Sequence, residues 1–171
     1  MIKDESTVDR ASQPVQKLPH GVSVRPAVTH FDDRGSVCEL YDERWEWNPA
    51  PLVYSYMFTL RPNKVKGWAK HLDHEDRYIV LTGEMQVVLY DSREDSPTCG
   101  LVSCAHLSEW NRRLLNIPIG IWHANFNPGA KDALTINFPT RAYDHLNPDK
   151  YRLPFDTDEI PYKFPPGASG G

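Results

Sequence analysis

The stretch that most constrains the fold runs from Lys66 to Asp91 and reads KGWAKHLDHEDRYIVLTGEMQVVLYD. It begins with a polar, histidine-rich loop and continues as two segments of alternating apolar and polar residues. These indicate two strands joined at Leu81-Thr82-Gly83-Glu84. A second stretch, NIPIGIWHANFN, contains a Pro-x-Gly-x-x-His motif that ends at His123. Together the two stretches predict two halves of the mouth of a small β-barrel.

Most of the remaining chain also has the pattern of short strands. Alternation predicts strands at 20–29, 36–41, 53–60, 77–81, 85–90, 101–105, 113–117, 122–126 and 133–138. A turn at Phe31-Asp32-Asp33-Arg34-Gly35 joins the first two of these as a hairpin. With fifteen prolines, ten glycines and no long amphipathic helix, the chain favours an all-β jelly-roll barrel over an α/β fold.

A chain of 171 residues suits one domain whose core needs no disulfide or metal to hold it together. We predict a disordered or weakly docked N-terminal arm at 1–17, a single domain at 18–164 and a flexible tail at 165–171. Residues 149–164, with their prolines and acids, are predicted to form an irregular cover over the barrel.

The charge and the cysteines exclude several classes of protein. A net charge of −4 argues against a nucleic-acid-binding protein, whose binding face would be basic. The three cysteines lack metal-ligand spacing and suit free thiols in a reducing cytosol. No apolar run approaches a membrane span, and the first sixteen residues lack the apolar core of a secretion signal. We therefore expect a cytoplasmic protein that binds neither nucleic acid nor membranes.

Five motifs follow one another along the chain. They are Phe31-Asp-Asp-Arg-Gly-x-x-x-Glu39, Lys66-Gly-Trp, Leu81-Thr-Gly-Glu-Met, Leu89-Tyr-Asp-x-Arg-x-x-Ser-Pro97 and Ile117-Pro-Ile-Gly-Ile-Trp-His123. Through them the chain resembles the dTDP-4-dehydrorhamnose 3,5-epimerases of the cupin superfamily over residues 20–164. The resemblance implies a double-stranded β-helix barrel and a homodimer without a cofactor. It also implies an isomerase of carbohydrate biosynthesis that moves protons next to the 4-keto group of a dTDP-type sugar.

Two positions that transfer protons in the epimerase family carry other residues in this chain. The histidine base of the family motif Arg-Gly-x-His aligns with Ala69. The tyrosine that stands six residues before a second tyrosine aligns with Asn137, counted back from Tyr143. The carboxylate that orients the base matches Asp156. The resemblance thus implies the binding site of the family without its usual base and acid.

His71 is the candidate to replace the missing base. It lies two residues after Ala69, and residues i and i+2 of an extended strand point to the same face. A neutral imidazole removes a proton next to a carbonyl, and returns it, near pH 7. His123, whose position the second motif fixes, is predicted to polarise the ketone or to donate to the enolate oxygen. The alternative for His71 is a structural role, with its ring bonded to nearby backbone.

Several further residues are predicted to bind the substrate. Arg34 follows Asp32 and Asp33 in the predicted turn. In the epimerase family, an arginine at this place holds the diphosphate through paired hydrogen bonds. Lys66 replaces a second family arginine and keeps its charge. Tyr56 and Trp68 would stack on a base or a sugar, although rings on alternating strands also build cores. The remaining predicted substrate-binding residues are Glu39, Arg77, Asn137 and Tyr143.

The same segment offers an alternative, metal-dependent site. Many cupins hold a divalent ion with histidines and a carboxylate, and the available residues here are His71, His74, Asp76 and His123. The odd spacing of His71 and His74 would point them to opposite faces of a regular strand, so such a site requires a loop or a bulge. A third hypothesis is a non-catalytic protein that binds a sugar nucleotide, because function depends on the site and not on the barrel.

Overall fold

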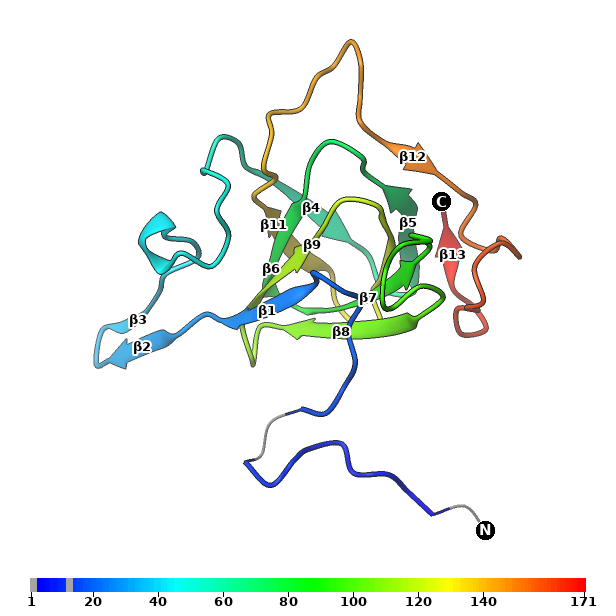
Figure 1. Ribbon diagram of the computed structural model, residues 1–171. Coiled ribbons are helices and arrows are strands. Elements are labelled where there is room, and N and C mark those ends of the chain that lie inside the picture. The colour runs from blue at the N-terminus through cyan, green and yellow to red at the C-terminus, as the bar shows by residue number, and fades with distance from the viewer. Residues whose placement is uncertain (1–2, 12–13) are drawn as a thin grey trace.

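The computed structural model describes residues 3–11 and 14–171, and it is almost entirely β-structure (Figure 1). One short 3-10 helix spans Glu43–Trp45. No helix in these described ranges is long and apolar enough to cross a membrane. The strands are β1 Ser23–Pro26, β2 Thr29–Asp32, β3 Gly35–Cys38, β4 Tyr56–Leu60, β5 Lys64–Lys70, β6 Asp76–Thr82, β7 Glu84–Asp91, β8 Val102–Ser108, β9 Arg113–Ile117, β10 Ile121–Phe126, β11 Ala133–Asn137, β12 Tyr151–Arg152 and β13 Ser169–Gly170.

Two antiparallel sheets form the barrel. The five-stranded sheet has the order β1-β9-β6-β11-β4; the six-stranded sheet has the order β12-β5-β10-β7-β8, with β13 added in parallel beside β5. The main core contains buried side chains from strands of both sheets, among them Leu60, Val80, Met85, Leu89 and Leu115. Apolar side chains alternate inward along these strands, as a sheet with one buried face requires. The predicted all-β jelly-roll barrel is confirmed.

The turn at Leu81-Thr82-Gly83-Glu84 carries the chain from one sheet to the other. β6 pairs with β9 and β11, whereas β7 pairs with β10 and β8, so the two strands that the turn joins are not hydrogen-bonded to each other. Gly83 has a φ of +77°, and a Cβ there would lie 2.7 Å from the carbonyl oxygen of Asp132. Only glycine combines this backbone conformation with so close an approach to Asp132. The turn at Gly83 therefore places β7 in the second sheet, opposite β6.

The N-terminal segment differs from the predicted hairpin. β1 leaves the hairpin and pairs with β9, because Val22 and Val24 pack against the main core. The hairpin itself is β2 with β3, and it projects from the barrel (Figure 1). Phe31 and Val37 on this hairpin are 78% and 68% exposed, so the hairpin presents apolar side chains to solvent.

Both predicted terminal segments make contacts with the barrel. Ser103 Oγ donates to the carbonyl oxygen of Lys17 at 2.7 Å, and residues 1–2 and 12–13 of the predicted arm lie outside the described residues. The segment 165–171 was predicted as a flexible tail, but its β13 pairs in parallel with β5. The reason is that β5 offers unpaired backbone groups along its outer edge, which an added strand satisfies.

Trp68 lies in a second core, contrary to its predicted role in ligand binding. Its side chain is fully buried and packs with Ile160 and with the rings of Tyr162 and Phe164. Alternation along β5 directs Trp68 away from the barrel interior, toward which its neighbour Ala69 points. The partners of Trp68 come from the predicted cover at 149–164, which indeed packs over this side of the barrel.

Arg77 was also predicted to bind substrate, but the structure gives it a structural role. Its fully buried guanidinium donates to the carbonyl oxygens of Ala50 at 2.9 Å, Pro51 at 3.0 Å and Phe138 at 2.6 Å. It also donates to the hydroxyl of Tyr41. A fork of five donors satisfies this many carbonyls at once, so Arg77 ties the segment before β4 to the end of β11.

We expect Arg77→Ala to lower the free energy of unfolding by about 3 kcal/mol or more, because several buried carbonyls lose a charged donor. Urea unfolding followed by tryptophan fluorescence measures the loss. Arg141→Ala is the control: this side chain is 65% exposed and has one ion pair, with Asp73 at 3.8 Å. The control should change stability by no more than about 0.5 kcal/mol. Equal losses in both variants would contradict the role of Arg77.

Candidate active site

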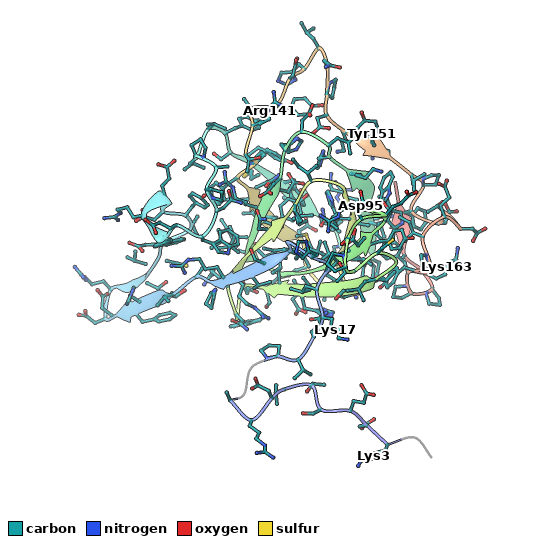
Figure 2. The ribbon with its side chains drawn as sticks, in the orientation of Figure 1. Lys3, Lys17, Asp95, Arg141, Tyr151 and Lys163 are labelled. Carbon is teal, nitrogen blue, oxygen red and sulfur yellow. The ribbon has the colours of Figure 1, made fainter. Side chains whose placement is uncertain are left out.

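A cavity of about 400 Å³ lies between the two sheets, bordered by the connection from β11 to β12. Arg141 marks the start of that connection and Tyr151 marks its end (Figure 2). Each sheet supplies one wall, and the connection adds polar side chains. The lining residues used below are Tyr54, Tyr56, Lys66, Ala69, His71, His74, Asp76, Tyr78, His123, Asn125, Arg141, Tyr143, Asp149, Lys150 and Arg152.

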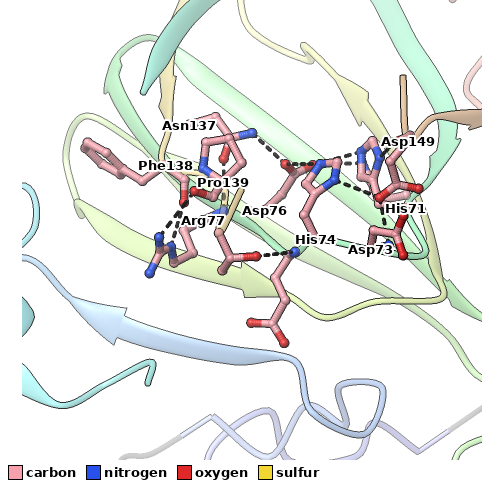
Figure 3. Close-up of polar contacts among 12 residues, drawn as sticks. His71, Asp73, His74, Asp76, Arg77, Asn137, Phe138, Pro139 and Asp149 are labelled. Atoms are coloured by element: carbon pink, nitrogen blue, oxygen red, sulfur yellow. Dashed lines mark hydrogen bonds and ion pairs between the residues drawn. The ribbon is translucent and has the colours of Figure 1, made fainter. Parts of the chain in front are cut away.

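The carboxylate of Asp76 is the centre of the polar network in this cavity. Asp76 begins β6 and is 2% exposed. Its Oδ2 accepts from the hydroxyl of Tyr78 at 2.9 Å and lies 3.3 Å from Nε2 of both His71 and His123. Its Oδ1 accepts from Nδ2 of Asn137 at 2.6 Å (Figure 3). Burial would raise the pKa of Asp76, but the hydrogen bonds from His123 and His71 hold it well below its usual value.

His71 uses both of its ring nitrogens. Nδ1 is hydrogen-bonded to the backbone carbonyl oxygen of Asp149, and because a carbonyl only accepts, Nδ1 carries a proton. Nε2 faces the carboxylate of Asp76 at 3.3 Å. Burial lowers the pKa of His71, but the hydrogen bond and the charge of Asp76 outweigh burial and raise it. His71 therefore favours the protonated, cationic form.

His74 has one bonded and one free ring nitrogen. Nδ1 donates to Oδ2 of Asp149 at 2.8 Å, and the same carboxylate accepts from the backbone N–H groups of Leu72 and Asp73. Nε2 lies 3.8 Å from Oδ1 of Asp76, beyond hydrogen-bond distance. Burial and the charge of His71 lower the pKa of His74, so its ring favours the neutral form. A neutral imidazole held by a carboxylate can act as a general base.

The two rings meet because β5 ends at Lys70. His71 and His74 lie in the loop that follows, and their ring centroids are 4.0 Å apart. The opposite-face geometry of a regular strand therefore does not apply to them. The loop is fixed by Asp149, whose carboxylate and carbonyl oxygens together accept from four groups of residues 71–74 (Figure 3).

The wall formed by the five-stranded sheet carries an amide and a phenol. Asn137 on β11 is the register partner of Tyr56 on β4, and its Nδ2 donates to the hydroxyl oxygen of Tyr56 at 3.0 Å. The same Nδ2 donates to Asp76. Burial, followed by the charge of Asp76, raises the pKa of Tyr56, so the phenol stays protonated. Asn125, on the other sheet, has a buried Oδ1 without a hydrogen-bond partner in the described part of the chain.

Positive side chains gather along one part of the cavity. Lys66 projects from β5, Arg152 comes from the paired strand β12, and Lys150 directly precedes β12. Burial lowers the pKa of Lys150, and the charges of Arg152 and Lys66 lower it further. Cations close enough to affect each other in this way form a site for an anion.

The cavity contains five of the residues predicted for catalysis or substrate binding, namely Tyr56, Lys66, His71, His123 and Tyr143. Asn137 lies behind Tyr56 and acts through its hydrogen bonds. The predicted catalytic carboxylate Asp156 is exposed, lies outside the cavity lining, and uses its backbone carbonyl to accept from Lys163 Nζ at 3.3 Å. Asp149 holds the imidazole instead, because it belongs to the connection that crosses the cavity.

Arg34 and Glu39 do not reach the cavity of their own chain. Arg34 is 85% exposed at the tip of the β2–β3 hairpin, where its guanidinium pairs with Asp32 of the same turn. Glu39 follows β3 and is exposed. The hairpin projects away from the barrel, so these residues contact a ligand only if the ligand is bound by another copy of the chain (Figure 1).

Sequence reasoning missed Asp149 and the cations Lys150 and Arg152. They lie in the segment NPDKYR, where no periodic pattern marks a functional face. Asp149 is 75 residues from His74 in sequence, and only the path of the connection brings them together. The one available signal is a cluster of opposite charges next to prolines in a segment without a periodic pattern.

The structure also brings together the alternative metal ligands. One ligand atom from each of His71, His74 and Asp76 lies within 4.8 Å of the others, and Nε2 of His123 is 3.3 Å from Asp76. Both Nδ1 atoms in the loop bond oxygens of Asp149, so a bound metal would take the Nε2 atoms and replace the contact of His71 Nε2 with Asp76. This donor set fits a divalent ion such as Zn, Fe, Ni or Mn.

Comparisons with known proteins agree on one family. The sequence model for dTDP-4-dehydrorhamnose 3,5-epimerase matches residues 16–153. The chain is 35% identical to the probable low-salt glycan biosynthesis epimerase Agl13 of Haloferax volcanii, over 80% of this chain and 88% of that protein. It is 34% identical to the spore coat polysaccharide biosynthesis protein SpsL of Bacillus subtilis, over 84% and 95%. The crystal structure of a dTDP sugar isomerase from Desulfovibrio desulfuricans G20 superposes with a TM-score of 0.79 at 27% identity, covering 85% of this chain and 91% of that one.

We expect Asp76→Asn to lower the pKa of His71, because the variant removes the negative charge that stabilises the imidazolium. Histidine NMR titration of metal-free protein measures this pKa. The wild-type pair contributes stability that is fully present below about pH 6.5 and is lost as the pH rises through the folded-state pKa. Asp73→Asn is the control, since the single ion pair of this exposed neighbour among the described residues is with Arg141 at 3.8 Å. An unchanged His71 pKa in Asp76→Asn would contradict the assignment.

Proposed function

The chain belongs to the dTDP-4-dehydrorhamnose 3,5-epimerase family, and from that membership we propose that it moves a proton at a carbon next to the keto group of a dTDP-type sugar. Such an enzyme is an isomerase of carbohydrate biosynthesis, in line with the names of its two curated relatives. The required groups are a base for the carbon-bound proton, donors for the enolate oxygen, and cations for the diphosphate. Each has a candidate in or beside the cavity.

The observation that carries the proposal is the pair formed by Asp149 and His74. The carboxylate orients the imidazole through Nδ1 at 2.8 Å, and Nε2 has no hydrogen-bond partner among the residues that the structure describes. The ring lines the cavity and favours the neutral form. A substrate carbon near Nε2 would lose its proton to this nitrogen, with the resulting imidazolium stabilised by Asp149.

We assign His71 and His123 to the enolate oxygen. His71 was predicted to be the base, but both of its nitrogens are engaged and it favours the cation, so it would stabilise the enolate through its positive charge. His123 is buried beside it, with ring centroids 5.3 Å apart, and keeps the predicted role of polarising the ketone. Preorganised charges and dipoles beside the developing negative charge lower the barrier to enolate formation.

The cations Lys66, Lys150 and Arg152 would hold the diphosphate. They line one part of the cavity and influence one another electrostatically. A diphosphate brought among them would relieve that repulsion and gain charge-assisted hydrogen bonds. Tyr143 and Tyr54 provide exposed and half-buried rings nearby, on which the base or sugar can stack.

A divalent ion is the second candidate for the chemistry at the ketone. The ligands would be His71, His74, Asp76 and His123, and the ion would act as a Lewis acid toward the ketone oxygen. In that case His74 is a ligand and cannot be the base. A non-catalytic role in binding sugar nucleotides is the third hypothesis, and the experiment below separates all three.

We further propose a cytoplasmic homodimer. The cytoplasmic location is supported by free thiols at Cys38, Cys99 and Cys104. The dimer is supported by an exposed apolar surface on and near the hairpin, which contains Val28, Phe31, Val37 and Trp110. A monomer rarely leaves so many large apolar side chains exposed in one region. A second copy of the chain would cover them and would bring Arg34 and Glu39 of one copy toward the other.

We expect His74→Ala to slow proton exchange by about 10²- to 10⁴-fold, the usual contribution of a general base. The assay incubates a dTDP-4-keto-6-deoxy sugar with the protein in D2O and follows deuterium at C3 and C5 by NMR. His106→Ala is the control, because His106 is exposed on β8 and does not line the cavity.

Other outcomes of this assay identify the competing hypotheses. Unchanged deuterium exchange in His74→Ala, together with loss of exchange in His71→Ala, would identify His71 as the base. Loss of wild-type exchange on chelation, restored by Zn, Ni or Mn, would select the metal-dependent reaction. No exchange at high protein concentration, with dTDP still raising the melting temperature, would leave a binding protein.

We expect the wild-type protein to have twice the mass of one chain in light scattering. Val37→Asp should shift it toward the monomer, because it places a charge in an apolar interface. The control is Leu146→Asp, since Leu146 is 97% exposed in the β11–β12 connection and away from the hairpin. A monomeric wild-type protein, or a Val37→Asp variant that stays dimeric, would contradict the proposed interface.

A further inference from the structure

Inverting a carbon requires two proton carriers on opposite sides of the bound sugar ring. The imidazoles are held on the side of the six-stranded sheet: His123 lies on its strand β10, and Asp149, just before its strand β12, binds the rings of His71 and His74 in the loop after β5. A proton delivered from that side alone restores the original configuration. The second carrier must therefore come from the five-stranded sheet, where Tyr56 lies on β4 and Tyr78 on β6.

Tyr56 has a hydroxyl proton that no other contact uses. Its oxygen accepts from Nδ2 of Asn137 at 3.0 Å, and a phenol that accepts one hydrogen bond still has its own O–H to donate. Within the described ranges no acceptor is hydrogen-bonded to that O–H. The residue lines the cavity and is 39% exposed, so a ligand can reach the hydroxyl.

The position of the Tyr56 hydroxyl is fixed by its surroundings. Asn137 is the register partner of Tyr56 in the β4–β11 pair, and its side-chain Oδ1 accepts from the backbone N–H of Arg77 at 2.9 Å. Its Nδ2 bridges the phenol and the carboxylate of Asp76. The amide is thus held at both ends, and it directs the phenol oxygen toward the same carboxylate that the imidazoles surround.

The other tyrosines of the cavity lack one of these features. Tyr78 is 4% exposed and its hydroxyl donates to Asp76 at 2.9 Å, so its proton is already used. Tyr54 lies beside Tyr56, with ring centroids 5.8 Å apart, but in the described residues no hydrogen bond fixes its hydroxyl. Tyr143 is in the connection and not on the sheet. Tyr56 alone among the four is on the required wall, fixed in position and free to donate.

We propose that Tyr56 is the catalytic acid that protonates the enolate on the face opposite His74, so that the reaction inverts the carbon. His74 Nε2 takes the carbon-bound proton, and the C–H electron pair becomes the enolate. The enolate then forms a new C–H bond with the hydroxyl proton of Tyr56. The electrons of the O–H bond stay on the phenolate oxygen, which the amide of Asn137 stabilises. Solvent returns a proton to Tyr56 and removes one from His74, which restores both groups.

The inference rests on the proposed function, and it predicts that exchange and inversion can be separated. We expect Tyr56→Phe to keep deuterium exchange into the substrate within about tenfold of wild type, because the base is intact. Formation of the inverted sugar should fall by about 10²- to 10⁴-fold, as for loss of a general acid. The same D2O assay reports both quantities when the configuration of the product is read from its NMR coupling constants.

Tyr151→Phe is the control, since it removes the hydroxyl of a tyrosine that is 51% exposed on β12 and does not line the cavity. It should retain both exchange and inversion, and both variants should melt near the wild-type temperature. Inversion at the wild-type rate in Tyr56→Phe would overturn the proposal while leaving the proposed function intact. Loss of exchange and inversion together in a folded Tyr56→Phe variant would also overturn it. Absence of exchange in the wild-type protein would instead reject the proposed function itself.

Discussion

The site depends on one buried carboxylate. Asp76 is almost fully removed from solvent, and an ionised group in that environment is tolerated only if it is fully paired. Its partners come from different parts of the barrel: Tyr78 from its own strand, Asn137 from β11, His123 from β10 and His71 from the loop after β5. The carboxylate therefore connects both sheets at the cavity. Its charge also sets the protonation state of the imidazole next to it.

Asp149 is the second residue that holds the site together, and it lies in the β11–β12 connection outside the barrel strands. Its carboxylate holds the backbone of Leu72 and Asp73 and the ring of His74, while its carbonyl holds His71. Two adjacent imidazoles next to unequal partners acquire different properties. His71, beside the buried anion, is biased toward the cation, and His74, beside that cation, is biased toward the neutral base.

The sequence predicts the barrel and one wall of the site, because both depend on alternation. Period two places Ala69 of β5 and His123 of β10 at one cavity, whereas His71 reaches that cavity from the loop after β5. The same alternation directs Trp68 to the opposite face of β5. The prediction that Trp68 contacts a ligand was therefore inconsistent with the alternation. Alternation says nothing about irregular segments. Hence Asp149, in a connection without strands, and Arg77, whose carbonyl partners lie in a loop and at a strand end, could not be assigned from sequence.

In the proposed reaction, the substitutions at Ala69 and Asn137 change which residues carry the chemistry. Ala69 pairs in register with His123, and its small side chain leaves room beside that ring for the two imidazoles of the following loop. Asn137, too weak an acid to donate a proton, holds the phenol of Tyr56 on the adjacent strand. An imidazole, a carboxylate and a phenol thus face one cavity from new positions. A barrel brings many strand ends together at one opening. Different neighbouring positions can therefore supply the proton-transfer residues while the geometry around the substrate is kept.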